Sequence, residues 1–306
     1  TFLICLNFVI LTIFYASNST VNSLPTLAIF AAAAFRIMPS VGRMMVQLNT
    51  LKSNLPVSKI IKNEIENLEE YREEKIVNLN FKKSINMKNI KFSYNEKSKN
   101  VLENVNIKID KGSVIGITGG SGSGKSTLLD LLIGLIIPDE GEIFLDEVSI
   151  KNNIKSWQKK IGYVSQEIFL LNDTFLKNIS YEMDENIIDY EKVKNLIKIL
   201  ELEKFIENLS EDLNSKVGER GIKMSGGQLK RIGIARALYR SPDILILDET
   251  LSSLDIETEK KIMSEIKSFD KNLTVIIVSH RPNTLKLCDK VYEVENKKIE
   301  LINYEK

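Results

Sequence analysis

One glycine-rich stretch constrains the fold of this chain more than any other part of the sequence. It runs from Gly119 to Thr127, between the apolar runs Val114–Thr118 and Leu128–Ile133. The first run predicts a buried parallel strand, and the second predicts a helix that packs against it. A strand, a glycine-rich loop and a helix in this order predict a site that binds phosphate groups.

The residues of this loop have the chemistry that a phosphate group requires. Glycines let the backbone curl so that successive N–H groups point at an anion, and the helix N-terminus adds a partial positive charge. We expect Lys125 to reach the β- and γ-phosphates of a nucleotide and the Ser126 hydroxyl to coordinate Mg²⁺. A flexible Gly/Ser turn is the alternative, which the Lys-Ser-Thr ending disfavours. The predicted phosphate-binding residues are Gly119, Gly120, Ser121, Gly122, Ser123, Gly124, Lys125, Ser126 and Thr127.

Composition sets a few further limits. The 306 residues include 42 basic and 41 acidic side chains, a net charge of +1 that gives no reason to expect nucleic acid. Cys5 and Cys288 lie far apart and predict neither a disulfide framework nor a metal cluster. The chain begins with Thr1, so we expect a fragment or a processed product, and its first apolar stretch lacks the features of a signal peptide.

Two apolar stretches dominate the first fifty residues. The first, 1–16, predicts a truncated membrane helix, because a complete span needs about 20 residues. A polar loop separates it from the second, 24–48, which is apolar on all sides up to residue 35 and predicts another membrane helix. A soluble helical hairpin is the alternative. Basic residues gather only beyond residue 35, which predicts that this end lies in the cytoplasm.

Arg36 has two possible roles within the second stretch. A charge at membrane depth is costly and tends to face a cavity or a partner, so Arg36 could line a path for an anionic headgroup. It could equally snorkel to the inner interface. Pro39 is expected to kink the helix. The charged segment 52–75 has apolar residues at helical spacing and predicts a cytoplasmic extension of the helix.

Two acids follow a buried run in the second half of the chain. The run Ile244–Leu247 predicts a strand, and Asp248 and Glu249 come directly after its apolar residues. Carboxylates at this position suit a magnesium–nucleotide site. We expect Asp248 to hold Mg²⁺, directly or through water, and Glu249 to polarise the attacking water.

Three other side chains lie near the ends of predicted strands. Gln166 follows the strand 161–164 and could bind Mg²⁺ or orient water. The only histidine, His280, follows the strand 274–278, where it could contact a γ-phosphate, although a lone histidine is usually structural. Tyr94 could stack on an adenine ring, although a lone tyrosine in a strand usually packs in the core.

A second glycine-containing motif opens another predicted helix. Met224–Gln228 reads MSGGQ and precedes the helix 229–239, so it predicts a second anion-binding helix N-terminus. The two helix starts are about 100 residues apart in sequence. One nucleotide could use both if two chains faced each other.

Taken together, these motifs resemble one family, the ATP-binding cassette (ABC) ATPases. Tyr94 falls where the family has its adenine-stacking aromatic residue, and Met224 is a departure because the family usually has leucine there. The matching motifs are Gly119–Thr127 as Walker A, Gln166 as the Q-loop, Met224–Gln228 as the signature, Ile244–Glu249 as Walker B with the catalytic glutamate, Ser252–Asp255 as the D-loop and His280 as the switch histidine.

The resemblance implies an α/β P-loop ATPase domain over 85–306 with an inserted helical subdomain at about 167–238. It would follow an all-α transmembrane segment, 1–75, and a linker, 76–84. ATP and Mg²⁺ are the implied cofactors. The implied residues are Glu249, His280 and Gln166 for catalysis, Ser126, Gln166 and Asp248 for the metal, and Tyr94, the loop Gly119–Thr127, Ser225, Gly226, Gly227, Gln228 and Asp255 for the nucleotide.

The resemblance also implies a function in transport. Val217–Gly221 is similar to the X-loop of ABC exporters, and residues 35–43 are weakly similar to lipid-linked oligosaccharide flippases. The chain would be a half-transporter in the cell membrane, multi-pass, with its ATPase domain in the cytoplasm. It would pair head to tail with a second copy or a paralogous half-transporter, contact membrane lipids and move an amphipathic substrate. A multidrug or peptide exporter, a soluble ABC ATPase of DNA repair or translation, and a membrane-bound regulatory module are the alternatives.

Overall fold

The computed structural model describes residues 9, 13, 15, 23–69, 79–95, 99–182, 184–217, 224–253 and 255–303. The chain divides into two units, Thr1–Glu73 and Glu74–Lys306. Most of the predicted first membrane helix, its following loop, part of the linker and the X-loop beyond Val217 lie outside the described residues.

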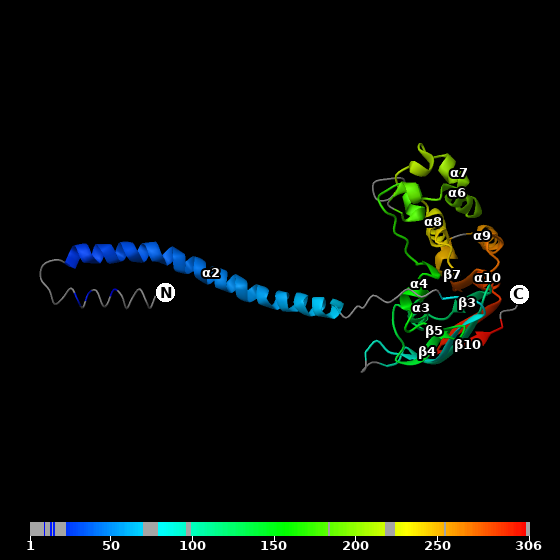
Figure 1. Ribbon diagram of the computed structural model, residues 1–306, viewed down its shortest axis with the longest axis horizontal. Coiled ribbons are helices and arrows are strands. Elements are labelled where there is room, and N and C mark those ends of the chain that lie inside the picture. Colours follow the sequence, from blue (N-terminus) through cyan, green and yellow to red (C-terminus); the bar gives the residue numbers. More distant parts are fainter. Residues whose placement is uncertain are drawn as a thin grey trace. The chain divides into compact units, whose positions relative to one another are not determined.

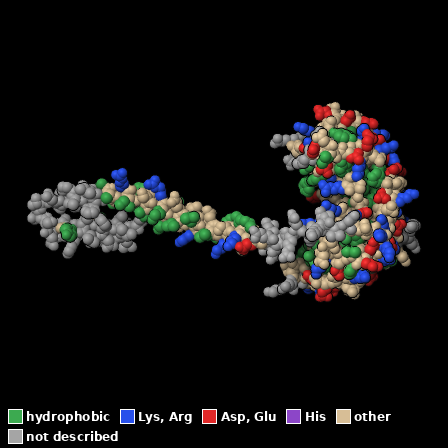
Figure 2. All heavy atoms as spheres, in the orientation of Figure 1, with side chains coloured by type: hydrophobic (Ala, Val, Ile, Leu, Met, Phe, Trp, Pro, Cys, Tyr) green, Lys and Arg blue, Asp and Glu red, His purple; other side chains and the backbone are tan. Residues whose placement is uncertain are grey.

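The first unit contains one long helix, α2 (Ser23–Glu69), of 47 residues with Pro39 and Pro56 inside it. The side chains described between residues 32 and 66 are exposed, with Val41 half-buried. Hydrophobic side chains lie on the surface along much of this helix (Figure 2). Among the described residues, no helix has both the length and the apolar character needed to cross a membrane.

The second unit is built on two sheets. The smaller is antiparallel with strand order β2-β1-β4-β5, and the larger has the order β10-β9-β3-β8-β7-β6. The neighbouring strands from β9 through β6 are parallel, while β10 pairs antiparallel with β9. The strands are β1 (Ser84–Phe92), β2 (Leu102–Asp110), β3 (Val114–Thr118), β4 (Glu140–Leu145), β5 (Val148–Ser149), β6 (Ile161–Val164), β7 (Ile244–Asp248), β8 (Thr274–Val278), β9 (Lys290–Glu295) and β10 (Lys298–Ile302).

Helices cover this framework and form a separate lobe. In Figure 1, α6, α7 and α8 lie in a lobe beside the sheets, while α3 and α4 lie near the strands. The helices are α3 (Lys125–Ile133), α4 (Ile154–Gln158), α5 (Phe175–Ser180), α6 (Tyr190–Ile199), α7 (Glu203–Glu207), α8 (Gly226–Tyr239), α9 (Ile256–Phe269) and α10 (Pro282–Leu285), with short 3-10 turns at Glu185–Ile187, Asp212–Asn214 and Thr250–Ser253. The predicted α/β class with an inserted helical subdomain is confirmed.

The larger sheet is buried on both faces. Leu245 and Leu247 of β7 belong to one hydrophobic cluster, which also includes residues of the helical lobe. Ile244 and Ile246 of the same strand belong to a second cluster, shared with α3 and the smaller sheet. Parallel strands covered on both faces have continuous apolar runs, and this explains why their sequences predicted them well.

The topology also fixes where the strand ends meet. Because β3, β8, β7 and β6 are adjacent and parallel, their carboxyl ends lie along one edge of the sheet. The phosphate loop, His280, Glu249 and Gln166 follow these four strands. The candidate site is therefore assembled at this edge.

Candidate nucleotide-binding site

The glycine-rich loop joins β3 to α3 through a backbone that requires glycine. Gly119, Gly122 and Gly124 have φ angles of 146°, 72° and 106°, in the region that side chains disfavour. A Cβ at Gly119 would lie 2.4 Å from the carbonyl oxygen of Val294. Gly124 is the N-cap of α3 and supplies no capping side chain. The first N–H groups of this helix are therefore left for another acceptor.

Two polar groups of the loop suit an anion. The Lys125 Nζ donates hydrogen bonds to the carbonyl oxygens of Gly119 and Gly120, at 2.9 and 2.8 Å, so the ammonium group folds over the loop. Within the described residues, the Ser123 hydroxyl is buried and has no hydrogen-bond partner. Buried polar groups usually have partners, so an unpaired hydroxyl in this loop fits a phosphate oxygen.

Tyr94 lies at the same helix start. Its hydroxyl is 3.0 Å from the Thr127 Oγ1. Its ring makes an edge contact with Phe92, with centroids 5.1 Å apart, and the residue is 58% exposed. The structure thus places an accessible aromatic ring beside the phosphate loop.

Of the three side chains predicted to be catalytic, Glu249 contacts the other two, Gln166 and His280. The Glu249 Oε2 accepts a hydrogen bond from the Gln166 Nε2 at 2.9 Å. The Glu249 Oε1 lies 3.1 Å from the His280 Nε2. Glu249 itself has a φ of 47°, a conformation that non-glycine residues rarely adopt. Backbone strain of this kind gathers at functional sites, so Glu249 is the natural centre of this cluster.

Asp248 lies next to this cluster in a partly buried position. Burial raises the pKa of its carboxyl group most strongly, and the charge of Glu249 raises it further. A hydrogen bond from the Tyr163 hydroxyl at 3.0 Å and the charges of Lys125 and Lys230 act in the opposite direction and lower the pKa. A partly desolvated carboxylate beside another carboxylate is a position that a cation would stabilise.

The described residues fit Mg²⁺ only together with other ligands. Nowhere in the described ranges do three or more His, Cys, Asp or Glu side chains form a group that could hold a metal ion. Mg²⁺ commonly binds through one or two protein oxygens, phosphates and water. Asp248, Gln166 and the exposed Ser126 are compatible with that pattern.

Sequence reasoning missed two residues at this site. Lys230, on α8, has its Nζ against the Gln166 carbonyl oxygen, and burial lowers its pKa. Tyr163, on β6, contacts Asp248. The available signals were a basic residue two positions after Gln228 and a tyrosine three positions before Gln166.

The second predicted anion site has a different local structure. The Ser225 Oγ accepts a hydrogen bond from the Gln228 N–H at 3.2 Å, and the Gln228 Oε1 accepts one from the Ser225 N–H at 2.8 Å. This reciprocal capping box fixes the start of α8. Ser225 and Gly226 are exposed, and a Cβ added at Gly226 would meet nothing within 4 Å. The hydrogen bonds of the capping box are internal to the motif, and among the described residues there is open space beside Gly226.

Asp255 also caps a helix. Its Oδ1 accepts a hydrogen bond from the Thr258 N–H at 2.9 Å, which starts α9 and lowers the pKa of the carboxyl group. Met224, the one departure from the family pattern, packs against the hydrophobic cluster of the helical lobe. An apolar side chain of similar volume to leucine serves that role.

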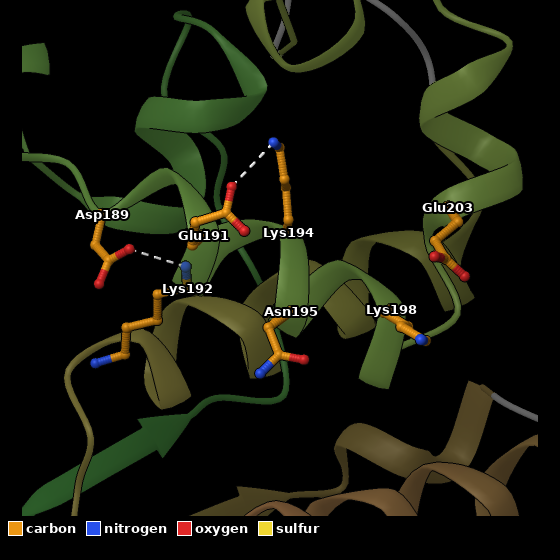
Figure 3. A pocket seen from close by; sticks show the side chains of 7 residues that line it. All are labelled: Asp189, Glu191, Lys192, Lys194, Asn195, Lys198 and Glu203. Atoms are coloured by element: carbon orange, nitrogen blue, oxygen red, sulfur yellow. Dashed lines mark hydrogen bonds and ion pairs between the residues drawn. The ribbon is translucent and has the colours of Figure 1, made fainter.

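A surface cavity of about 560 Å³ lies on the helical lobe, away from these residues (Figure 3). Several of its charged groups are already paired: the Lys194 Nζ is 3.1 Å from the Glu191 Oε1, and the Lys192 Nζ donates to the Ser241 Oγ at 2.7 Å. Asp189 accepts from the Lys192 N–H and caps α6. None of the predicted site residues lines this cavity. We interpret it as a solvated helix face.

Comparison with known proteins agrees with this geometry. The family described as "ABC transporter" matches residues 102–252. The chain is 41% identical to the ATP-dependent lipid A-core flippase of Wigglesworthia glossinidia brevipalpis, over 70% of this chain and 37% of that protein. It is 41% identical to the alpha-hemolysin translocation ATP-binding protein HlyB of Escherichia coli O157:H7, over 69% of this chain and 30% of that protein.

A solved structure gives the same result. A bacterial Atm1-family ABC exporter with ATP bound superposes with a TM-score of 0.71 at 30% identity, over 80% of this chain and 44% of that chain. The chain thus spans less than half the length of these relatives. Its second unit is a nucleotide-binding ATPase domain, and the chain belongs to the ABC transporter family.

Proposed function

We propose that this chain is the C-terminal part of an ABC exporter half-transporter, in which ATP hydrolysis drives a substrate across the cell membrane. The observation that carries the proposal is the contact of Glu249 with both Gln166 and His280, on the sheet edge that also carries the phosphate loop. The relatives named above are a flippase and a toxin translocation protein, which supports export as the use of this site.

The phosphate loop would bind the triphosphate of ATP. Its N–H groups and Lys125 would hold the phosphates, and the Ser123 hydroxyl would gain the partner that it lacks. Tyr94 would stack on the adenine ring. Ser126, Gln166 and Asp248 would hold Mg²⁺, which neutralises charge on the phosphates when bound.

Glu249 would act as the general base for hydrolysis. Its carboxylate would accept a proton from the attacking water, while Gln166 and His280 fix its two oxygens in place. His280 is 48% exposed, so its ring is accessible to a γ-phosphate as well.

A second chain would complete each nucleotide site. The exposed start of α8, with Ser225, Gly226, Gly227 and Gln228, would meet the phosphates bound by a partner, and Asp255 would lie at the same interface. The partner would be a second copy or a paralogous half-transporter. Two helix N-termini suited to anions in one sequence support this sharing.

Residues 1–75 would be the end of the transmembrane domain, with the multi-pass remainder lying before residue 1. The exposed apolar side chains of α2, among them Phe35, Met45 and Val46, would contact lipid or neighbouring helices. An amphipathic, lipid-linked oligosaccharide is our proposed substrate, and a multidrug or peptide exporter is the alternative. Arg36, exposed on α2, would either meet the anionic part of such a substrate or lie at the membrane interface.

The proposed function is tested by hydrolysis in the full-length protein, reconstituted in lipid. Glu249→Gln keeps the shape of the side chain but removes the base, so turnover should fall by about 10²–10⁴-fold while ATP still binds. Glu265→Gln on α9 is the matched control and should hydrolyse ATP as the wild type does. Absence of hydrolysis by the wild type, or unchanged turnover in Glu249→Gln, would contradict the proposal.

A further inference from the structure

Glu259 is a buried carboxyl group that the proposed chemistry does not use. It lies on α9, one turn after the capping residue Asp255, and only 1% of its surface is exposed. Within the described residues, neither carboxylate oxygen has a hydrogen-bond partner. Burial raises the pKa of this group. Because burial of an unpaired carboxyl group is costly, its presence in the interior requires a reason.

The helix that carries Glu259, α9, contacts α10, which follows His280 in the sequence. Thr284 of α10 is fully buried, and its hydroxyl also lacks a hydrogen-bond partner in the described part of the chain. This hydroxyl and the positive charge of Arg281 both lower the pKa of Glu259, the direction expected of groups that stabilise its carboxylate. The two unpaired groups therefore lie on two helices, α9 and α10, that contact each other.

Ser279, the residue before His280, is held by the larger sheet. The Ser279 N–H donates to the Ile117 carbonyl oxygen of β3 at 3.1 Å, and the Ser279 Oγ accepts from the Arg281 N–H at 3.0 Å. His280 itself is exposed and reaches Glu249 over 3.1 Å. The histidine therefore lies between one anchor in the sheet and a second at α10.

We propose that Glu259 is a positioning residue that holds the start of α10, through Thr284 and Arg281, and thereby keeps His280 against Glu249. The inference rests on the proposed ATPase function and adds a residue that touches neither nucleotide nor water. It also connects α9, whose N-cap is Asp255, to the histidine. A carboxyl group that served packing alone would be replaced without catalytic loss by an apolar side chain of similar size.

The test is Glu259→Leu in the full-length protein. Turnover should fall by about ten- to a hundredfold, the range expected when a catalytic group is misplaced, while the KM for ATP stays near that of the wild type. Glu265→Gln on the same helix is the control. Unchanged turnover in Glu259→Leu would overturn the proposal.

A double-mutant cycle separates positioning from general damage. In a His280→Ala background the histidine is already lost, so Glu259→Leu should cause no further loss of turnover. The same fold-change in both backgrounds would overturn the proposal. If Glu259→Leu does not fold, Thr284→Val is placed in the same cycle with the same expectations.

A readout without hydrolysis distinguishes failure of this inference from failure of the proposed function. The NMR signal of the His280 ring, identified by its loss in His280→Ala, should shift in Glu259→Leu and stay in place in Glu265→Gln. An unmoved signal in Glu259→Leu would overturn the positioning role, even if the wild type hydrolysed no ATP.

Discussion

The start of α3 and the start of α8 look alike in sequence and differ in structure. Both follow glycine-containing motifs that predicted an anion-binding helix N-terminus. At α3 the N-cap is Gly124, in a left-handed conformation with no capping side chain. At α8 the N-cap is Ser225, which forms a capping box with Gln228. The first N–H groups of α3 have no capping side chain and are left for a ligand. At α8, the Gln228 N–H is already bonded to the Ser225 Oγ.

This difference shows why glycine is needed in the phosphate loop but not for the backbone at Gly226. At the phosphate loop, positive φ angles and the close approach of Val294 to Gly119 require glycine for the backbone itself. At α8, no described residue outside the helix's own backbone lies within 4 Å of a Cβ added at Gly226. A requirement for glycine at that position would therefore come from a group other than these described residues, such as a nucleotide held by a partner.

The largest expected effect is on hydrolysis in mixed dimers. Homodimers of Lys125→Ala and of Ser225→Arg should each lose most hydrolysis, because both of their sites are damaged. In a dimer of one chain of each kind, one shared site carries both changes and the other carries neither, so activity should return. No recovery in mixed dimers of proven composition would contradict sharing, or would show that both sites must act together.

Loss of the loop lysine should weaken nucleotide binding. Lys125→Ala removes a charged hydrogen-bond donor, which contributes about 1.5–3 kcal/mol, so the Kd for ATP should rise by about 10–100-fold. Titration with a fluorescent ATP analogue measures this change. Lys151→Ala, an exposed lysine outside the loop, should bind as the wild type does. Equal affinity of Lys125→Ala and wild type would remove Lys125 from the phosphate site.

Alanine at Gly119 and at Gly226 should distinguish a glycine that the backbone conformation requires from a glycine that only a partner would require. Gly119→Ala places a Cβ against the Val294 carbonyl oxygen and should lower the free energy of unfolding by about 1–3 kcal/mol. Gly226→Ala meets open space and should leave the unfolding transition near that of the wild type. Denaturant unfolding of both variants provides the comparison. A large destabilisation by Gly226→Ala would show that α8 needs its glycine for its own fold.

The smallest expected effect is the loss of the α8 cap. Ser225→Ala removes the acceptor for the Gln228 N–H and should lower the free energy of unfolding by about 1 kcal/mol. The affinity of a single, unpaired chain for nucleotide at its phosphate loop should not change, because the capping hydrogen bonds are internal to the start of α8. Ser121→Ala changes an exposed serine of the phosphate loop. It is the comparison variant, because it removes a hydroxyl from the nucleotide site and none from a helix cap. A fall in single-chain affinity for Ser225→Ala would show that α8 contacts the nucleotide of its own chain.

The sequence by itself determined the strands of the buried sheet and the order of the motifs. The predicted strands 161–164 and 274–278 have the same bounds as β6 and β8. Continuous apolar runs identify strands that are covered on both faces, whatever their neighbours are. The spacing of Ser225 and Gln228 is also that of a capping box. The two glycines between them led to the prediction of an anion site instead.

Only the tertiary structure decided which side chains meet. Glu249 lies 83 residues from Gln166 and 31 from His280 in sequence, and nothing local brings them together. Their contact follows from the adjacency of β6, β7 and β8, as does the contact of Tyr163 with Asp248. The sequence reasoning did not predict β9 and β10; β9 pairs with β3, and β10 pairs with β9. Backbone preference is local and can be read from a short stretch, whereas the pairing of strands depends on the whole chain.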